Sequence, residues 1–117
     1  MVEEETIFHK IVKGQIPCKK VYENDDVLAF EDIQGQAPFH CLVIPKKMHG
    51  LSGLDKADES HIEILGKLLL AVSTIAKENG LEKGYRTVIN NGPDGAQSVF
   101  YIHVHLMGKR QMKWPPG

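Results

Sequence analysis

A chain of 117 residues, 42% hydrophobic and 25% charged, has the size and composition of one ordinary globular core. Its net charge of −1, with lysines and arginines scattered along the chain, excludes the basic surface of a protein that grips a nucleic acid polymer. No apolar run is long enough to cross a bilayer, and residues 1–5 are acidic where a secretory signal is basic. We therefore expect a single domain over residues 1–117 in the cytoplasm, with the nucleus as a second compartment, and neither membrane nor nucleic acid polymer as a partner.

The first part of the chain predicts a short helix and three strands. Thr6 is a good helix cap, and Gly14 is suited to ending that helix. Residues 24–26 are turn-prone and join two strands as a hairpin, and Pro45 ends a third strand because proline cannot donate to a sheet ladder. The predicted elements are a helix over residues 7–12 and strands over residues 20–23, 27–32 and 40–44.

The second part of the chain predicts the main helix and two further strands. From a start near Ala57, apolar residues recur at three- and four-residue intervals, which places one apolar stripe along a helix that Asn79 and Gly80 end. The stripe consists of Ile62, Leu65, Leu68, Leu69, Val72, Ile75 and Ala76. Strands are predicted over residues 86–90 and 99–107. These elements indicate an α+β fold, with a mostly antiparallel five-stranded sheet, one main helix and a short N-terminal helix.

An alternating segment near the C-terminus is the clearest candidate for chemistry. With a period of two, Tyr101, His103 and His105 share one face of a strand, and the aliphatic residues between them take the other. Two adjacent imidazoles can hold or move protons near neutral pH. Two surface histidines would give the same alternation, so spacing alone leaves both interpretations open. His9 and His61 lie on predicted helices among charged neighbours and are expected to be exposed.

The same pair of histidines is also compatible with a metal site. His-x-His on a strand brings two imidazoles close enough to share a zinc ion, but zinc needs a third or fourth ligand. The candidates are His40, Cys41 and His49, none of which has a close ligand spacing to the pair. The metal interpretation therefore stays open as a minor alternative.

A polar, glycine-containing loop over residues 91–98 precedes the histidines. Gly92 and Gly95 permit backbone conformations in which successive N–H groups point at an anion. The loop lacks the Gly-Lys-Ser/Thr ending of a P-loop, so it gives no evidence of magnesium-dependent triphosphate cleavage. Asn90, Gln97 and Ser98 add neutral donors that can hold phosphate oxygens. The position of this loop directly before His103 indicates a phosphate site.

A series of short segments, in order along nearly the whole chain, matches one known family. They are Thr6–Phe8, Ile16–Pro17, Leu28–Phe30, Asp32–Ile33, Gln36–Pro38, His40, Leu42–Lys47, Gly84–Arg86, Gln97–Val99, Arg110–Met112 and Trp114–Gly117. On these segments the sequence resembles the histidine triad (HIT) superfamily, and within it the histidine triad nucleotide-binding (Hint) branch, also called protein kinase C-interacting proteins. The terminal segment favours the Hint branch over the dinucleoside polyphosphate hydrolases and the cap-scavenging members.

The resemblance implies a HIT-like homodimer that binds a purine nucleoside monophosphate and hydrolyses adenosine 5′-phosphoramidates, including adenylylated lysine, and aminoacyl adenylates. His103 matches the histidine that attacks the α-phosphate and takes the nucleotidyl group, and His105 and Ser98 match residues beside the phosphate and the leaving group. The implied nucleotide site comprises the base-facing residues Ile7, Phe8, Ile11, Phe30 and Ile33, the ribose-binding Asp32, the phosphate-side residues Asn90, Ala96, Gln97 and Ser98, and His103 and His105. We expect no cofactor.

Position 101 departs from the family pattern of three alternating histidines. In the family, the first histidine communicates with the histidine that matches His40, which is a fourth catalytic residue, whereas this chain has Tyr101. A phenol, with a pKa near ~10, is a poor proton relay at neutral pH. Two functions remain: a hydrolase with altered turnover, and a nucleotide-binding or scaffold protein whose catalysis is weakened by Tyr101. Ala96 also replaces a common glycine of the family.

Overall fold

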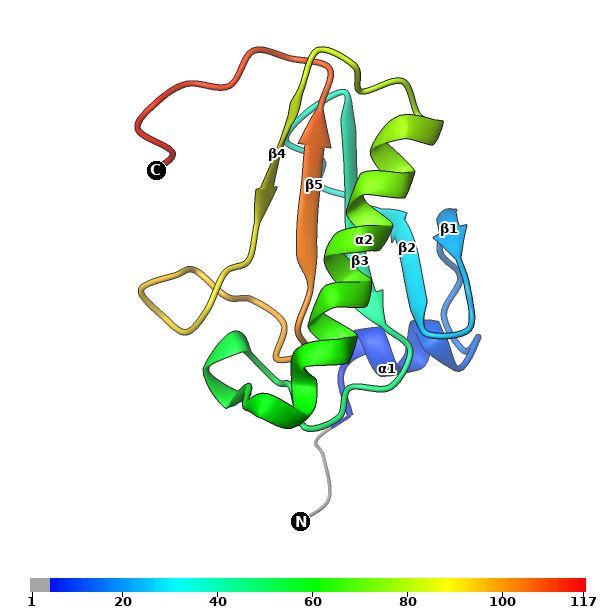
Figure 1. Ribbon diagram of the computed structural model, residues 1–117. Helices are drawn as coiled ribbons and strands as arrows, with labels where there is room; N and C mark the ends of the chain where they lie inside the picture. The colour runs from blue at the N-terminus through cyan, green and yellow to red at the C-terminus, as the bar shows by residue number, and fades with distance from the viewer. Residues whose placement is uncertain (1–4) are drawn as a thin grey trace.

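One antiparallel sheet forms the centre of the protein. The computed structural model describes residues 5–117, and its strands lie in the order β1-β2-β3-β5-β4 with every neighbouring pair antiparallel (Figure 1). The elements are α1 (Ile7–Val12), β1 (Lys20–Glu23), β2 (Val27–Glu31), β3 (Phe39–Pro45), the 3-10 turns η1 (Leu54–Lys56) and η2 (Glu59–His61), α2 (Ile62–Glu78), β4 (Tyr85–Val88) and β5 (Val104–Gly108). The expected α+β fold, with five antiparallel strands, one main helix and a short N-terminal helix, is confirmed.

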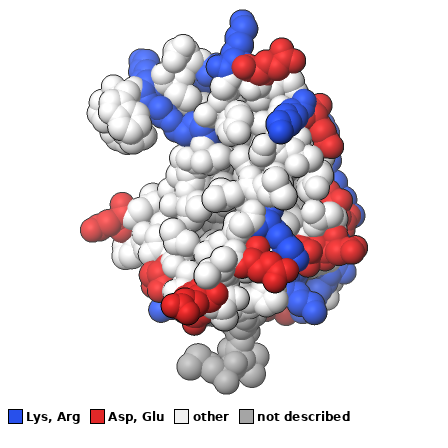
Figure 2. Space-filling model, in the orientation of Figure 1, with Lys and Arg blue, Asp and Glu red and all other residues white. Residues whose placement is uncertain are grey.

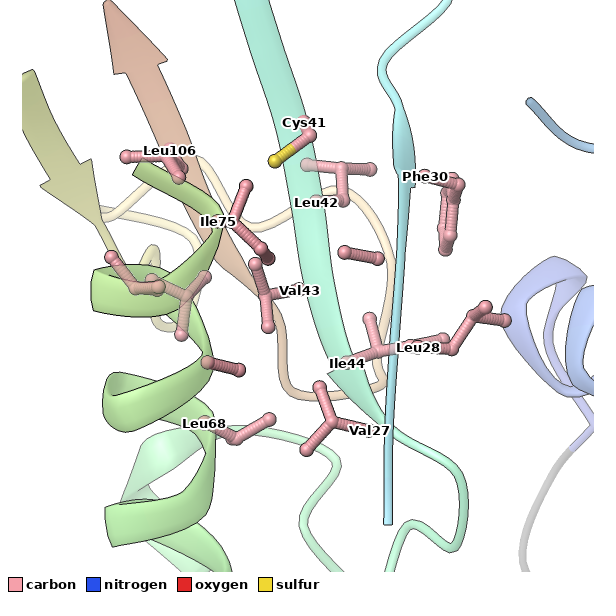
Figure 3. Close-up of a cluster of buried hydrophobic side chains, with 14 of the residues drawn as sticks. Val27, Leu28, Phe30, Cys41, Leu42, Val43, Ile44, Leu68, Ile75 and Leu106 are labelled. Carbon is pink, nitrogen blue, oxygen red and sulfur yellow. The ribbon is translucent and has the colours of Figure 1, made fainter. Parts of the chain in front are cut away.

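The two helices cover opposite faces of the sheet. Cys41 lies opposite Leu106 in the β3–β5 register, and Figure 3 shows both beside Ile75 of α2, with Phe30 pointing to the other side, towards α1. Successive side chains of a strand point to opposite faces. His105, one residue before Leu106, therefore faces away from α2, which places it on the α1 side of the sheet.

The hydrophobic core lies between the sheet and α2, where the predicted apolar stripe packs. The buried residues of α2 are Leu68, Ala71, Val72, Ile75 and Ala76. Ala71 was not among the predicted stripe residues, and the predicted members Ile62 and Leu69 are 70% and 54% exposed. The helix ends at Glu78, and Gly80 follows with a φ of 70°, a left-handed conformation that glycine adopts without strain. No helix among residues 5–117 is long and apolar enough to cross a membrane.

Two histidines that were expected on the surface serve as helix caps instead. Thr6 caps α1 by accepting hydrogen bonds from Phe8 N and His9 N, and His9 Nδ1 accepts in return from Thr6 N at 2.9 Å. His61 Nδ1 accepts from Asp58 N at 3.1 Å in the same reciprocal arrangement, and His61 is buried. The prediction of exposure was therefore wrong for both, because each ring is needed to satisfy a backbone donor.

Several element boundaries also differ from the predictions. The strand predicted over residues 99–107 begins only at Val104, because Ile102 N donates to Leu51 O (2.8 Å) and not to a neighbouring strand. Tyr101 and Ile102 are each 1% exposed, and the rings of Tyr101 and His103 both contact Phe8, so Tyr101 and His103 share the α1 side although the strand has not begun. The main helix starts at Ile62 after two 3-10 turns, and the fourth strand spans Tyr85–Val88. The single-domain prediction stays a prediction.

Candidate active site

Three imidazoles meet on the face of the sheet opposite α2. His105 lies opposite Leu42 in the β3–β5 register, which makes His40 its diagonal neighbour across the two strands. His103 precedes β5 directly. The ring centroids of His40 and His105 are 5.2 Å apart, and those of His103 and His105 are 5.1 Å apart. The sheet register thus brings a residue from position 40 to the predicted pair.

His103 is held in a nucleophilic form. Its Nδ1 donates to the carbonyl oxygen of Tyr101 at 2.7 Å, and a carbonyl can only accept, so the ring proton lies on Nδ1 and Nε2 keeps its lone pair. His103 is 4% exposed, and its ring stands edge-on to Phe8 at 5.0 Å. Burial lowers the pKa of His103 below its usual range despite the hydrogen bond to Tyr101, which keeps the imidazole neutral at pH 7.

His105 has the opposite tautomer because of a chain of hydrogen bonds through His40. The backbone N–H of Gln36 donates to His40 Nδ1 at 2.9 Å, so the proton of a neutral His40 lies on Nε2. His40 Nε2 is 2.9 Å from His105 Nδ1, to which it donates. His105 therefore carries its own proton on Nε2. The site presents a bare nitrogen on His103 and an N–H donor on His105.

The same chain of hydrogen bonds opposes protonation of His105. Burial first, and then the neighbouring His103 and His40 rings, lower the pKa of His105 to about 4, although Asp32 opposes that shift. A second proton on His105 would have to sit on Nδ1, facing the Nε2–H of His40 only 2.9 Å away. The pKa of His40 is lowered as well, by burial first, although Asp32 opposes that shift. All three rings are consequently neutral at physiological pH.

Asp32 lies beside this group, in the loop between β2 and β3. Its Oδ2 is 3.4 Å from His40 Nε2, and its Oδ1 accepts from Gln34 N at 2.8 Å. The backbone N–H of Asp32 also donates to the carbonyl of His40 at 3.0 Å, which ties the loop to β3. The structure therefore brings Asp32 to the histidines, and its assignment to the ribose stays a prediction.

The predicted phosphate loop is held by its own hydrogen bonds. Gln97 Nε2 donates to Ser52 O at 2.6 Å and its Oε1 accepts from Gly92 N at 2.9 Å, while Ser98 is exposed. Ala96 adopts a φ of 59°, so this residue takes the left-handed conformation of the glycine it replaces. The N–H groups of Ala96 and Gln97 donate to the Pro93 and Gly92 carbonyls within the loop, and the assignment of these residues to the phosphate stays a prediction.

The residues expected to face the base fall into two groups. Phe8 and Phe30 are buried and stand edge-to-face with ring centroids 5.5 Å apart, and Ile11 is half-buried beside them. Ile7 is 47% exposed and Ile33 is 97% exposed, so these two have little packing of their own. The half-buried Asn90 follows the end of β4. Phe8 is the member of the first group that also contacts His103.

A metal ion does not fit the histidines as they are arranged. Asp32, His40 and His105 offer three donor atoms within 4.8 Å of one another, the one such group among residues 5–117. A neutral histidine that binds a metal through one nitrogen keeps a donating N–H on the other. His40 would bind through Nε2, yet its Nδ1 faces the Gln36 N–H and accepts from it. Cys41 lies on the α2 face, and burial raises the pKa of its thiol to about 12, which disfavours the thiolate.

Sequence reasoning missed two backbone groups that contact the site. Gln36 acts through its backbone N–H, and no side-chain pattern reports where a loop N–H points. Pro45 accepts a hydrogen bond from the hydroxyl of Tyr101, a contact between residues 56 positions apart. The carbonyl that fixes the tautomer of His103 belongs to Tyr101, two residues earlier in the chain.

Comparisons with known proteins agree with this architecture. Residues 13–112 match the HIT domain family. A 14 kDa zinc-binding protein from Zea mays is 62% identical over 112 residues, which cover 96% of this chain and 88% of that protein. Adenylylsulfatase HINT1 from Arabidopsis thaliana is 58% identical over 112 residues, covering 96% of this chain and 76% of that protein. A HIT family hydrolase from Legionella pneumophila Philadelphia 1 has a structure with a TM-score of 0.92 at 43% identity, covering 97% of this chain and 100% of that one.

The sheet, its histidine cluster and these matches define the class: the chain belongs to the HIT family. Within that family it is a Hint-like hydrolase, which confirms the resemblance seen in the sequence.

Proposed function

We propose that this protein hydrolyses a bond to the α-phosphate of a purine nucleotide, with adenosine 5′-phosphoramidates as the preferred substrate class. The observation that carries the proposal is the pair of opposite tautomers on His103 and His105. One ring offers a lone pair to attack phosphorus, and its neighbour offers an N–H to hold a phosphate oxygen. A reaction at phosphorus needs both at once.

The first step forms a bond from His103 Nε2 to phosphorus and breaks the bond from phosphorus to the leaving nitrogen. The Nδ1–H of His103 stays on the Tyr101 carbonyl, which stabilises the positive charge that develops on the ring. His105 Nε2–H donates to an oxygen of the phosphate in the transition state. The leaving amine takes one proton, which reaches it from solvent through the hydroxyl of the exposed Ser98.

The second step hydrolyses the nucleotidyl-histidine. Water attacks phosphorus, the bond from phosphorus to His103 Nε2 breaks, and the water releases to solvent one proton, which balances the proton consumed in the first step. The products are a nucleoside monophosphate and a free amine. Splitting one difficult displacement into two easier ones is the usual advantage of a covalent nucleophile.

The proposed substrate class draws on the name of one relative and on two features of the site. The Arabidopsis thaliana relative is named an adenylylsulfatase, and adenylyl sulfate carries its leaving group on the α-phosphate of adenylate, as a phosphoramidate does. Asp32 lies next to the histidines, where it suits the ribose hydroxyls, and the Phe8–Phe30 pair suits one face of a base. These observations favour an adenylylated amine such as adenylyl-lysine, and also an aminoacyl adenylate, in which the leaving group is a carboxylate that needs no proton.

We further infer that two copies of the chain associate. Ile62, Leu69 and Leu70 of α2 are 54–70% exposed, and Tyr85 of the edge strand β4 is 44% exposed. Figure 2 shows the area over β4, β5 and the adjacent part of α2 as largely uncharged. An exposed apolar surface beside an open sheet edge favours pairing with a second copy. Sedimentation velocity tests this, and a monomer at micromolar concentration would contradict it.

The test of the proposed reaction is AMP release from a fluorogenic adenosine 5′-phosphoramidate. His103→Ala should lower kcat by at least about 10⁴-fold, because it removes the nucleophile. Acid-quenched wild-type protein should carry AMP on His103, as peptide mass spectrometry would show. The matched control is His49→Asn, at an exposed position with a φ of 56° that asparagine tolerates, and it should keep wild-type turnover.

The competing function makes a different prediction for the wild-type chain. A nucleotide-binding or scaffold protein with catalysis weakened by Tyr101 would bind AMP, as measured by calorimetry, and release none from the substrate. That outcome would overturn the hydrolase proposal and retain the nucleotide site. Absence of any AMP binding would overturn both.

A further inference from the structure

Tyr101 occupies the position of the first histidine in the family pattern, and the proposed reaction makes no use of its side chain. The residue is 1% exposed. A buried phenol is costly unless its hydroxyl is hydrogen-bonded, and here it donates to the carbonyl of Pro45, the last residue of β3. The ring also stands edge-on to His9 at 4.8 Å and to Phe8 at 5.9 Å. The side chain of Tyr101 is thus fixed against both β3 and α1.

The backbone of the same residue sets the tautomer of His103. Its carbonyl accepts from His103 Nδ1 at 2.7 Å, although residues 99–103 lie outside β5. The peptide unit that carries the Tyr101 carbonyl is also held through its own N–H, because Ile102 N donates to Leu51 O at 2.8 Å. The direction of the Tyr101 carbonyl therefore depends on two anchors, this hydrogen bond on the Ile102 side and the side-chain contacts on the Tyr101 side.

Resting on the proposed function, we propose that Tyr101 is a positioning residue for the nucleophile. Its hydroxyl, anchored on the Pro45 carbonyl, holds the Tyr101 backbone so that its own carbonyl accepts the Nδ1 proton of His103. The phenol proton stays on this anchor and does not move during turnover. Tyr101 therefore orients the backbone carbonyl at position 101, and the shared proton lies between His40 and His105.

The test is Tyr101→Phe, which removes the hydroxyl and keeps the ring. We expect kcat to fall about tenfold, as is usual when a group that orients a reacting histidine is lost, while KM changes less than about twofold. Nitrogen-15 NMR of the histidine rings should show His103 changing from the pure Nδ1–H form to a mixture, with His105 unchanged. The pH dependence of kcat should keep its shape, because no proton carrier has been removed. Tyr22→Phe, on β1 with its hydroxyl at Asn24, is the matched control and should behave as wild type.

Three outcomes would overturn the inference: unchanged kcat in Tyr101→Phe, an unchanged His103 tautomer, or a pH profile that loses a limb, which would make the phenol a proton carrier. If Tyr101→Phe does not fold, Tyr101→His is the second variant, and it should keep the Nδ1–H form of His103 because its ring nitrogen can again donate. Loss of that form in folded Tyr101→His would also contradict the inference. Absence of turnover in the wild type would instead contradict the proposed function, since the NMR signature does not depend on activity.

Discussion

His103 and His105 are two residues apart, yet the protein holds them by different means. His105 belongs to β5, where the register with β3 places it against His40, and a side chain from another strand fixes its tautomer. His103 lies before the strand, and the carbonyl two residues earlier fixes its tautomer. One ring is therefore oriented by long-range sheet pairing and the other by local backbone geometry.

The difference shows how one short segment can contain two histidines with opposite roles. In a regular strand both rings would have similar surroundings, and nothing would distinguish their nitrogens. Because the strand begins only at Val104, Ile102 N–H donates to Leu51 outside the β5 ladder, and the carbonyl of Tyr101 is directed towards His103. A donor and a nucleophile can then stand side by side without exchanging protons.

The largest expected effect comes from removing His40, the hydrogen-bond partner of His105. His40→Phe keeps a ring but leaves His105 Nδ1 without its donor, so we expect kcat to fall by about 10- to 100-fold. Nitrogen-15 NMR should show His105 as a mixture of tautomers while His103 stays in the Nδ1–H form. His40→Gln, whose amide can donate at a similar place, should recover part of the turnover. Equal loss of both tautomers would mean that the two rings are not held independently.

The second largest expected effect is a loss of folding stability at low pH, which arises from His105. The pKa of His105 is about 4 in the folded protein, below the ordinary value of 6.5, so the unfolded chain binds more protons between these pH values. Folding stability is fully present above pH 6.5 and is lost as the pH falls towards 4, by up to about 3 kcal/mol. Urea unfolding at pH 7.5, 6 and 5 measures this. His105→Gln should flatten the dependence, and an equally steep dependence in that variant would assign it to other groups.

The smallest effect concerns the support of His103 by α1. Thr6→Ala removes the cap of α1, which carries Phe8 against the His103 ring, and should cost about 1 kcal/mol of stability. Thermal unfolding measures the loss. Thr74→Ala, on α2 with its hydroxyl bonded to Leu70 O, is the control and should change stability by less than half as much. If both variants lose equally, the cap contributes nothing specific to α1.

Much of the fold was predictable because periodicity reports burial. The stripe along α2 and the cap at Thr6 follow from residue types that favour those positions, and both are present in the structure. The start of β5 was not predictable, since Tyr101–Leu106 alternates in sequence while Ile102 pairs with Leu51 in space. Alternation describes residue types and carries no information about which backbone groups find partners.

The sequence predicted which residues form the candidate site better than it predicted where the protons of their rings lie. His103 and His105 follow from their spacing, and His40 and Asp32 from the resemblance to the HIT family. The direction of each proton depends on Gln36 N–H and the Tyr101 carbonyl, which act through backbone atoms that every residue has. The N–H groups of Ala96 and Gln97 likewise donate to backbone groups of their own loop, and the assignment of these residues to a phosphate stays a prediction.

The neutrality of the three rings has a consequence for which ligands stay bound. Burial lowers the pKa values of His40, His103 and His105, so at pH 7 none of them offers a positive charge to a phosphate, and the carboxyl group of Asp32 lies 3.4 Å from His40. In the proposed reaction the substrate brings a singly charged phosphorus centre, whereas free AMP approaches two negative charges. A site made of neutral donors beside a carboxyl group holds the first better than the second. Hydrolysis in the proposed reaction therefore weakens binding of the product, because it increases the negative charge on the phosphate. That change in charge favours product release.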